Sequence, residues 1–202
     1  EPGYREELAG GIAAELPLLL GVIPFGLIFG VQGLAAGLPA WAVVVMSSVV
    51  FGGSSQVVFA QLWGAQVPAA VITATVGVVN LRHALYSASM AQYLRELPLR
   101  WRLLLSYLLT DEAYAAAIKR FANGAATPHR HFFLLGTGFT LWAGWQLSTL
   151  AGVLIGSAIP ASWSLDFSIA LTFIALVVPA LRRRSECVAA AVAAIVALSL
   201  QG

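Results

Sequence analysis

Residues 67–94 have the sequence VPAAVITATVGVVNLRHALYSASMAQYL, a run long enough to cross a bilayer as a helix. Asn80, Arg82 and His83 lie close to the middle of this run. An ionisable side chain at the centre of a bilayer costs about 3 kcal/mol or more unless it has a partner or faces a water-filled cavity. The run therefore predicts a membrane protein with a functional polar site inside the bilayer.

The composition of the whole chain supports this interpretation. Of its 202 residues, 59% are hydrophobic and 10% are charged, whereas soluble domains have about 25% charged residues. The apolar runs extend over about twenty residues or more, which predicts helices, because the strands of a membrane β-barrel alternate over about ten residues. We therefore expect an all-α polytopic membrane helix bundle, with residues 1–202 forming a single transmembrane domain.

The charge distribution and the cysteine content argue against several other classes of protein. The basic residues cluster at the ends of apolar runs, where they act as topology signals, so the net charge of +2 does not indicate nucleic-acid binding. Cys187 is the single cysteine, which excludes an internal disulfide and a redox pair. A hydrolase that used His83 with Asp111 or Glu112 would lack a convincing nucleophile motif. We expect neither an enzyme nor a bound metal or cofactor.

Two other apolar runs, 40–64 and 99–121, are interrupted by polar residues. The first contains FGGSSQ at 51–56, where paired glycines followed by serines are typical of one helix ending and the next beginning. The second contains LTDE at 109–112, where a capping threonine precedes two acids in a first helical turn. In hydrocarbon such breaks persist only where they are buried in protein or line a cavity. The simpler alternatives are a small-residue packing interface and an amphipathic surface helix.

Five further segments are expected to be full spans. They are residues 11–38, 67–94, 132–159, 166–181 and 186–202. The first contains Pro17 and Pro24 and is expected to be a kinked helix inside the bundle. Glu15 lies about one turn inside it, as either an interfacial carboxylate or a proton site. Because the N-terminus lacks the features of a secretory signal, we expect this first span to be retained.

The basic residues favour one topology. If runs 40–64 and 99–121 are re-entrant, all basic residues except Arg82 fall on the cytoplasmic side, together with the N-terminus. The connections 64–68 and 159–164, which have no basic residue, then face outward. The alternative is that both interrupted runs cross the membrane completely as broken helices.

Within residues 67–94, helical spacing predicts a small, polar face. Its members are Thr73, Gly77, Asn80, Ala84 and Ser87, and Arg82 would point roughly the other way. In the alternative, the membrane-spanning part ends near residue 81 and an amphipathic helix continues along the membrane surface to residue 94.

The polar interruptions predict a substrate site. Two half-helix N-termini, one at Ser54 or Ser55 and one at Thr110, would direct free N–H groups and about half a positive charge each at a common point. Transporters bind substrate carboxylates in this way, and Arg82 can add a fork of donors. The expected substrate-binding residues are Gly52, Gly53, Ser54, Ser55, Gln56, Asn80, Arg82 and Thr110.

Three residues are candidates for proton coupling. Asp111 and Glu112 could contact a substrate ammonium group or carry a proton, and His83 titrates closer to neutral pH. Arg82 could pair with either acid when the site is empty. The alternative is a static ion pair that only holds the bundle together.

Several motifs resemble the AzlC family of branched-chain amino acid exporters, also called the LIV-E family. They are LPLLLGVIPFGLIFG at 16–30, FGGSSQVVF at 51–59, NLRHALYSAS at 80–89, LTDEAYAAA at 109–117 and DFSIALTFIALVVPAL at 166–181. Two departures are Val57, where this family usually has phenylalanine after the glutamine, and the family's final hydrophobic segment, which is missing after Gly202.

The resemblance implies a secondary active exporter of leucine, isoleucine and valine, with methionine as a further candidate, in the bacterial inner membrane. It also implies a small membrane partner subunit of the AzlD type. We expect proton exchange to drive transport and lipid to surround the bundle. The oligomeric state, including a higher oligomer, stays open. The rival functions are a passive channel for small solutes and a membrane scaffold that transports nothing.

Overall fold

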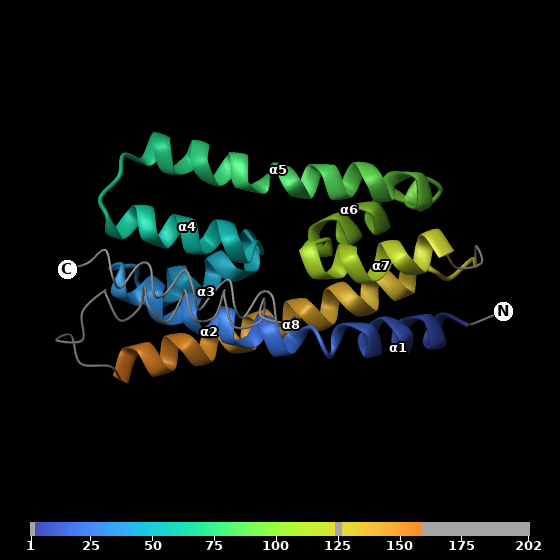
Figure 1. Ribbon diagram of the computed structural model, residues 1–202, viewed down its shortest axis with the longest axis horizontal. Helices are drawn as coiled ribbons and strands as arrows, with labels where there is room; N and C mark the ends of the chain where they lie inside the picture. The colour runs from blue at the N-terminus through green and yellow to red at the C-terminus, as the bar shows by residue number, and fades with distance from the viewer. Residues whose placement is uncertain (1–2, 124–126, 159–202) are drawn as a thin grey trace, which may run out of the picture.

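The computed structural model describes residues 3–123 and 127–158, and these ranges contain helices and no strand. The helices are α1 (Tyr4–Glu15), α2 (Leu19–Ala35), α3 (Ala40–Val49), α4 (Gly53–Gly64), α5 (Ala69–Leu94), α6 (Leu99–Leu108), α7 (Asp111–Asn123) and α8 (His131–Ala158) (Figure 1). The predicted all-α class is confirmed for these ranges. The expected spans 166–181 and 186–202 lie outside the described residues.

Two helices, α5 and α8, are long and apolar enough to cross a membrane. They have 26 and 28 residues, and about twenty residues suffice for hydrocarbon about 30 Å thick. The bent pair α1 and α2 also passes this test, which gives two or three candidate spans in the described part of the chain. Large apolar side chains such as Val78 and Leu85 of α5 are exposed, as expected for a surface that contacts lipid.

The first apolar run is broken rather than only kinked. Helix α1 begins at Tyr4 and ends at Glu15, and α2 begins at Leu19 with its axis bent by 66°. Pro17, which has no N–H to donate, lies in the break. Pro24 lies inside α2 without ending it. The prediction of one kinked helix from residue 11 is therefore corrected to two helices.

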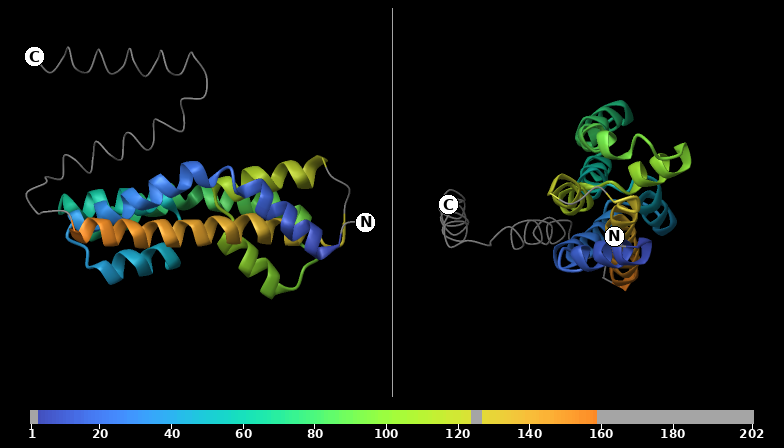
Figure 2. Two further views of the ribbon diagram at one scale, coloured as in Figure 1. Left: turned by 90° about the horizontal axis from the view of Figure 1, so that it is seen from below. Right: turned by 90° about the vertical axis from the view of Figure 1, so that its right-hand side faces the viewer.

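Both predicted interruptions are present, and each run forms a hairpin of two short helices. Helix α4 returns to the end of the bundle where α3 began. A Cβ atom at Gly64 would lie 3.2 Å from that of Ala36, the C-cap residue that follows α2. At the opposite end, Trp101 of α6 contacts His131, the first residue of α8, with ring centroids 4.9 Å apart. Figure 2, left, shows α3 and α6 on the same side of α8.

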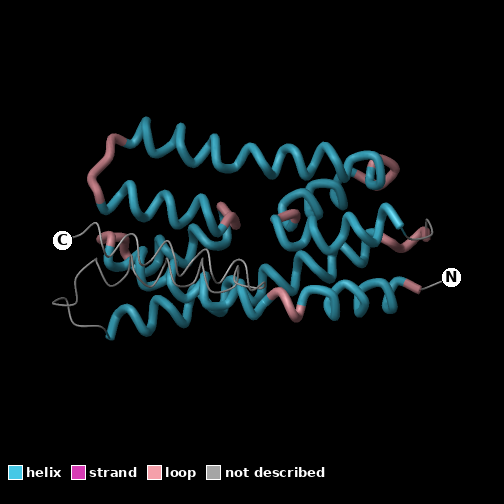
Figure 3. The backbone as a smooth tube through the Cα atoms, viewed as in Figure 1, coloured by secondary structure: helices cyan, strands magenta, loops and turns pink. Residues whose placement is uncertain are grey.

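The tips of the two hairpins meet in the middle of the bundle. The rings of Phe51 and Tyr107 lie 5.7 Å apart between centroids, and the Tyr107 hydroxyl donates to the carbonyl of Ser48. Figure 3 shows the two tips and the break between α1 and α2 as three loops near the centre of the molecule. All three interruptions of the helices therefore occur at a similar depth.

Helix α5 is continuous, without the bend near residue 81 that a surface-lying second half would require. Its packed face is centred on His83 and Tyr86, and the Tyr86 ring stacks on Tyr114 of α7 at 4.6 Å. The small, polar face is not the one packed against the other described helices, because its members at positions 73, 77 and 84 are exposed. The rotation of the helix brings Arg82 inward instead.

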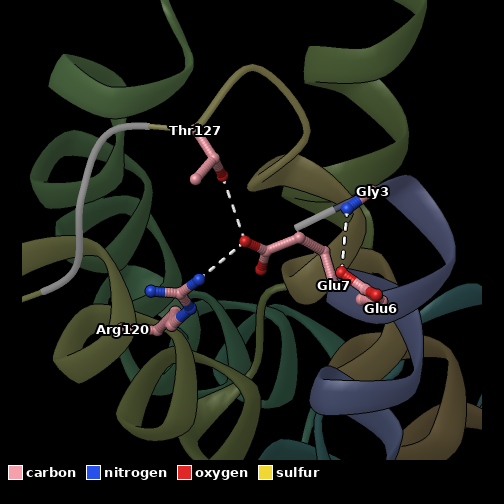
Figure 4. Close-up of polar contacts among 5 residues, drawn as sticks. All are labelled: Gly3, Glu6, Glu7, Arg120 and Thr127. Carbon is pink, nitrogen blue, oxygen red and sulfur yellow. Dashed lines mark hydrogen bonds and ion pairs between the residues drawn. The ribbon is translucent and has the colours of Figure 1, made fainter. Parts of the chain in front are cut away.

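A buried ion pair joins α1 to α7 at the end of the bundle where the chain begins (Figure 4). The Glu7 carboxylate accepts from Arg120 Nη2 at 2.7 Å and from Thr127 Oγ1 at 3.0 Å. Only 1% of the Glu7 side chain is exposed, compared with 32% for Arg120. Nearby, Glu6 accepts from the N–H of Gly3 at 3.1 Å and so satisfies a free donor at the start of α1.

Replacing Arg120 by glutamine should destabilise the bundle, because it leaves the buried Glu7 carboxylate with Thr127 alone. We expect a loss of about 2 kcal/mol, less than for a fully buried pair because Arg120 is partly exposed. Thermal unfolding of the purified protein in detergent measures this loss. The neighbouring Lys119→Gln, at an exposed position, is the control, and equal effects of the two variants would contradict the assignment.

Candidate functional site

A cavity of about 310 Å³ lies where the three interruptions meet. It is lined by Leu18, Gly21, Val22, Phe25, Phe51, Gly52, Gly53, Ser54, His83, Thr110, Asp111, Glu112, Leu141 and Trp145. Leu18 comes from the break between α1 and α2, Gly52 from the α3–α4 tip and Thr110 from the α6–α7 tip. The cavity therefore combines helix ends with side chains of the long helices.

The tip between α3 and α4 is a sharp backbone turn. Phe51 has a φ of 37°, a left-handed conformation that costs a residue other than glycine of order 1–3 kcal/mol. Its buried ring, packed against Tyr107, offsets part of this cost. Gly52 is the N-cap of α4 and supplies no side-chain hydrogen bond, so the prediction of Ser54 or Ser55 as the cap is corrected. The first N–H groups of α4 are left for another acceptor.

The tip between α6 and α7 places Thr110 just before the first turn of α7. The carbonyl of Thr110 accepts from the N–H of Tyr114 at 2.8 Å, which begins the helical hydrogen bonds. The Thr110 hydroxyl is buried and has no hydrogen-bond partner among the described residues. It is thus a free polar group at the wall of the cavity.

An ion pair connects α5 to the start of α7. Arg82 Nη1 lies 3.0 Å from Asp111 Oδ2, and the Tyr86 hydroxyl donates to Asp111 Oδ1 at 2.5 Å. The side chains of Arg82 and Asp111 are 27% and 37% exposed, so the pair is not sealed inside the protein. The predicted pairing of Arg82 with an acid is therefore present. This geometry agrees both with a resting substrate site and with a static ion pair.

Many of the predicted site residues line the cavity together. They are Gly52, Gly53, Ser54, His83, Thr110, Asp111 and Glu112. Arg82 reaches this group through Asp111. Asn80 lies behind the α4 N-terminus, where its Oδ1 would be 3.2 Å from a Cβ atom at Gly52. The sequence thus predicted residues that come from three different helices and lie in one place.

Ser55 and Gln56 lie outside the cavity lining and are fully buried. The Ser55 hydroxyl donates to the carbonyl of Gly52 at 2.7 Å. Gln56 Nε2 donates to Ser47 Oγ at 3.1 Å, and that hydroxyl donates to Thr149 Oγ1 at 3.0 Å. These contacts connect α3, α4 and α8 behind the tip, so in this structure the two side chains position the turn.

The cavity has an apolar wall, and four of its residues were not among the predicted site residues. They are Val22, Phe25, Leu141 and Trp145. The Trp145 ring is buried and stacks on Phe29 at 6.2 Å between centroids. The position of Trp145 is a signal that could have revealed the wall, since tryptophans of membrane proteins gather at the interfaces and this one lies deep in α8.

Two glutamates near the cavity have no ion-pair partner among the described residues. Glu112 lines the cavity, and the ion pairs in the described ranges involve only Asp111 and Glu7 as acids. Glu15 is fully buried, and neither of its oxygens has a hydrogen-bond partner there. In the same ranges no cluster of three or more histidine, cysteine or acidic residues could hold a metal ion.

The close packing around Gly53 predicts that Gly53→Ala narrows the cavity. A Cβ atom there would lie 2.8 Å from the Trp145 ring and 3.0 Å from the Phe25 ring, and such overpacking costs about 1–3 kcal/mol. Gly77→Ala is the matched control, because nothing lies within 4 Å of that Cβ position. Thermal unfolding should show a lower midpoint for Gly53→Ala alone. An unchanged midpoint would mean that the wall is not packed as described.

Comparisons with known proteins agree with these features. The sequence model of one family, described as AzlC protein, matches residues 17–159. An uncharacterized membrane protein of Archaeoglobus fulgidus is 29% identical over 178 residues, which cover 86% of this chain and 76% of that protein. The inner membrane protein YgaZ of Escherichia coli K12 is 25% identical over 188 residues, which cover 90% and 76%. No solved structure matches the chain.

Proposed function

Because the chain belongs to the AzlC family of membrane proteins, we propose that it exports branched-chain amino acids as a secondary active transporter. The matched region includes all three interruptions and the cavity between them. The similarity to an inner membrane protein of Escherichia coli supports a location in the inner membrane. The substrates would be leucine, isoleucine and valine, with methionine as a further candidate.

The observation that carries this proposal is the mixed lining of the cavity. The N-terminus of α4, the acids Asp111 and Glu112, and the rings of Phe25 and Trp145 all line it. A branched-chain amino acid has the same mixed character, with a charged head and an apolar side chain. The volume of about 310 Å³ is at the lower end of the range of about 300–1,000 Å³ for small-molecule sites. A small solute therefore fits this cavity best.

The charges of the site assign an orientation to the substrate. Its carboxylate would accept from the free N–H groups at the start of α4, where the helix dipole is positive. Arg82 would add a second set of hydrogen-bond donors once the substrate carboxylate replaces Asp111 as its partner. The ammonium group would contact Glu112, which has no competing ion pair among the described residues. The side chain would then lie along Trp145.

Proton exchange follows from the same contacts. Glu112 can bind the substrate ammonium as an ionised carboxylate, but a protonated Glu112 cannot form that ion pair. Binding of a substrate and of a proton then exclude one another at this side chain, as an antiporter requires. His83 and Asp111, which also line the cavity, are the further candidates for carrying the proton.

The distribution of basic residues supports a re-entrant arrangement of both hairpins in the membrane. The end of the bundle that holds the start of α1 also holds the connections 95–98 and 127–130, shown at the right in Figure 1. Basic residues gather there, at Arg5, Arg95, Arg100, Arg102, Lys119, Arg120 and Arg130. The connections 36–39 and 65–68 at the opposite end have none. By the positive-inside rule the first end is cytoplasmic, and α1 with α2, α5 and α8 would cross the membrane.

Reconstituted vesicles distinguish this function from its rivals. With the chain and a small AzlD-type partner in the membrane, a pH gradient should drive leucine against its own concentration gradient. A passive channel would only dissipate the leucine gradient. A scaffold would bind the partner without binding leucine. Either of these two results would overturn the proposal.

The ion pair allows a sharper test. Asp111→Asn should abolish leucine efflux driven by the pH gradient, because the variant removes an acid of the cavity and releases Arg82. Glu6→Gln, which changes an exposed acid in the first turn of α1, should transport leucine as the unmodified protein does. Unchanged gradient dependence in Asp111→Asn would rule this acid out as a proton carrier. The assay is radiolabelled leucine efflux from vesicles at a set pH gradient.

A further inference from the structure

Two glutamates of α1 are buried, and their surroundings differ. Glu7 and Glu15 are 3% and 0% exposed. Glu7 has a cation and a hydroxyl within hydrogen-bond distance, Arg120 and Thr127 (Figure 4). Neither oxygen of Glu15 has a hydrogen-bond partner in the part of the chain that the structure describes. A buried carboxylate without a partner costs far more as an anion than as a neutral acid. Glu7 therefore has partners that stabilise a carboxylate, whereas Glu15 has none among the described residues, and its site favours the neutral acid.

Among the described helices packed against α1, none pairs a cation with Glu15, and Arg120 of α7 is paired with Glu7. Helix α1 packs against α8 and α7. From residue 132 to residue 158, α8 has no charged side chain and no histidine, and residues 16–38 of the adjoining segment have none either. On α7, Glu112 is close enough to act on Glu15 electrostatically. Its neighbour Asp111 is paired with Arg82, so the charge that Glu15 meets is that of another acid.

Glu15 lies next to the central cavity without lining it. It is the last residue of α1, directly before the break at residues 16–18. Leu18 of that break lines the cavity, as does Glu112. Glu15 is therefore close to the cavity, and Glu112 is the acid of the cavity lining that acts on it electrostatically.

We propose that Glu15 and Glu112 form a proton-binding pair, in which Glu15 holds a proton when the cavity is empty and releases it through Glu112 when a substrate ammonium group enters. This inference rests on the proposed export function. The O–H bond of Glu15 breaks, and its proton passes to the Glu112 carboxylate and then to water in the cavity. Both carboxylates are left ionised, and the ammonium group of the substrate supplies the compensating positive charge. The substrate and the proton thus compete for the same two carboxyl groups, those of Glu15 and Glu112.

Proton release measured during leucine binding tests the pair. Purified protein in weakly buffered detergent solution, with a pH indicator dye, should release protons when leucine is added. Because binding releases a proton, the affinity for leucine should rise by up to about tenfold for each unit by which the pH is increased. In Glu15→Gln and in Glu112→Gln the release should disappear and the affinity should become independent of pH. Glu7→Gln, which alters the other buried glutamate of α1, should behave as the unmodified protein does.

Infrared spectroscopy supplies a readout that does not depend on transport. The protonated carboxylic acid band of the unliganded protein should decrease in Glu15→Gln and persist in Glu7→Gln. Undiminished proton release in Glu15→Gln, or an unchanged band, would overturn the inference even if leucine binds normally. Failure of the unmodified protein to bind leucine at all would instead remove the proposed function. Because glutamine has nearly the same shape as glutamate, these variants are expected to fold like the unmodified protein.

Discussion

The end of a helix cannot lie in hydrocarbon unless its free N–H and C=O groups find partners. This constraint organises the bundle, because three helix interruptions occur in its middle, at residues 16–18, 50–52 and 109–110. The structure brings all three to one cavity. Polar backbone groups that would each be costly alone in hydrocarbon thereby share a single cavity.

The same need for partners explains why the charged side chain of Arg82 is paired inside the bundle. Arg82 would be costly on a membrane helix by itself, but Asp111 at the start of α7 lies 3.0 Å away. Tyr86 and Tyr114 stack one helical turn from this pair and align α5 with α7. The two hairpin tips also contact each other through Phe51 and Tyr107. The polar groups are therefore positioned by aromatic packing on both sides of the cavity.

The sequence predicted the features that short stretches encode. FGGSSQ and LTDE each contain the residues that end one helix and begin the next, so both interruptions were found without knowledge of the fold. The partner of Arg82 followed from the need to balance a charge inside an apolar bundle. These inferences needed only the composition of each run and the order of the runs.

Features that depend on distant parts of the chain were missed. Gln56 turns away from the cavity because Ser47 and Thr149 lie behind it, and no local pattern shows that arrangement. The packed face of α5 depends on where the two hairpins lie, so helical spacing alone did not show that Arg82, rather than the small, polar face, points toward them. Glu15 stayed open between an interfacial carboxylate and a proton site because the first run was expected to begin at residue 11, whereas α1 begins at Tyr4.

The contacts of α8 divide the described helices into a rigid frame and a more loosely attached arm. A Cβ atom at Gly11 would collide with the carbonyl oxygen of Phe133, and one at Gly152 with that of Leu27, so the backbones of α1 and α2 touch α8 directly. Helix α5 instead meets the rest through side chains, foremost Arg82 and Tyr86. A solute that displaced Asp111 from Arg82 would remove a contact between α5 and α7 and leave the backbone contacts of α8 unchanged.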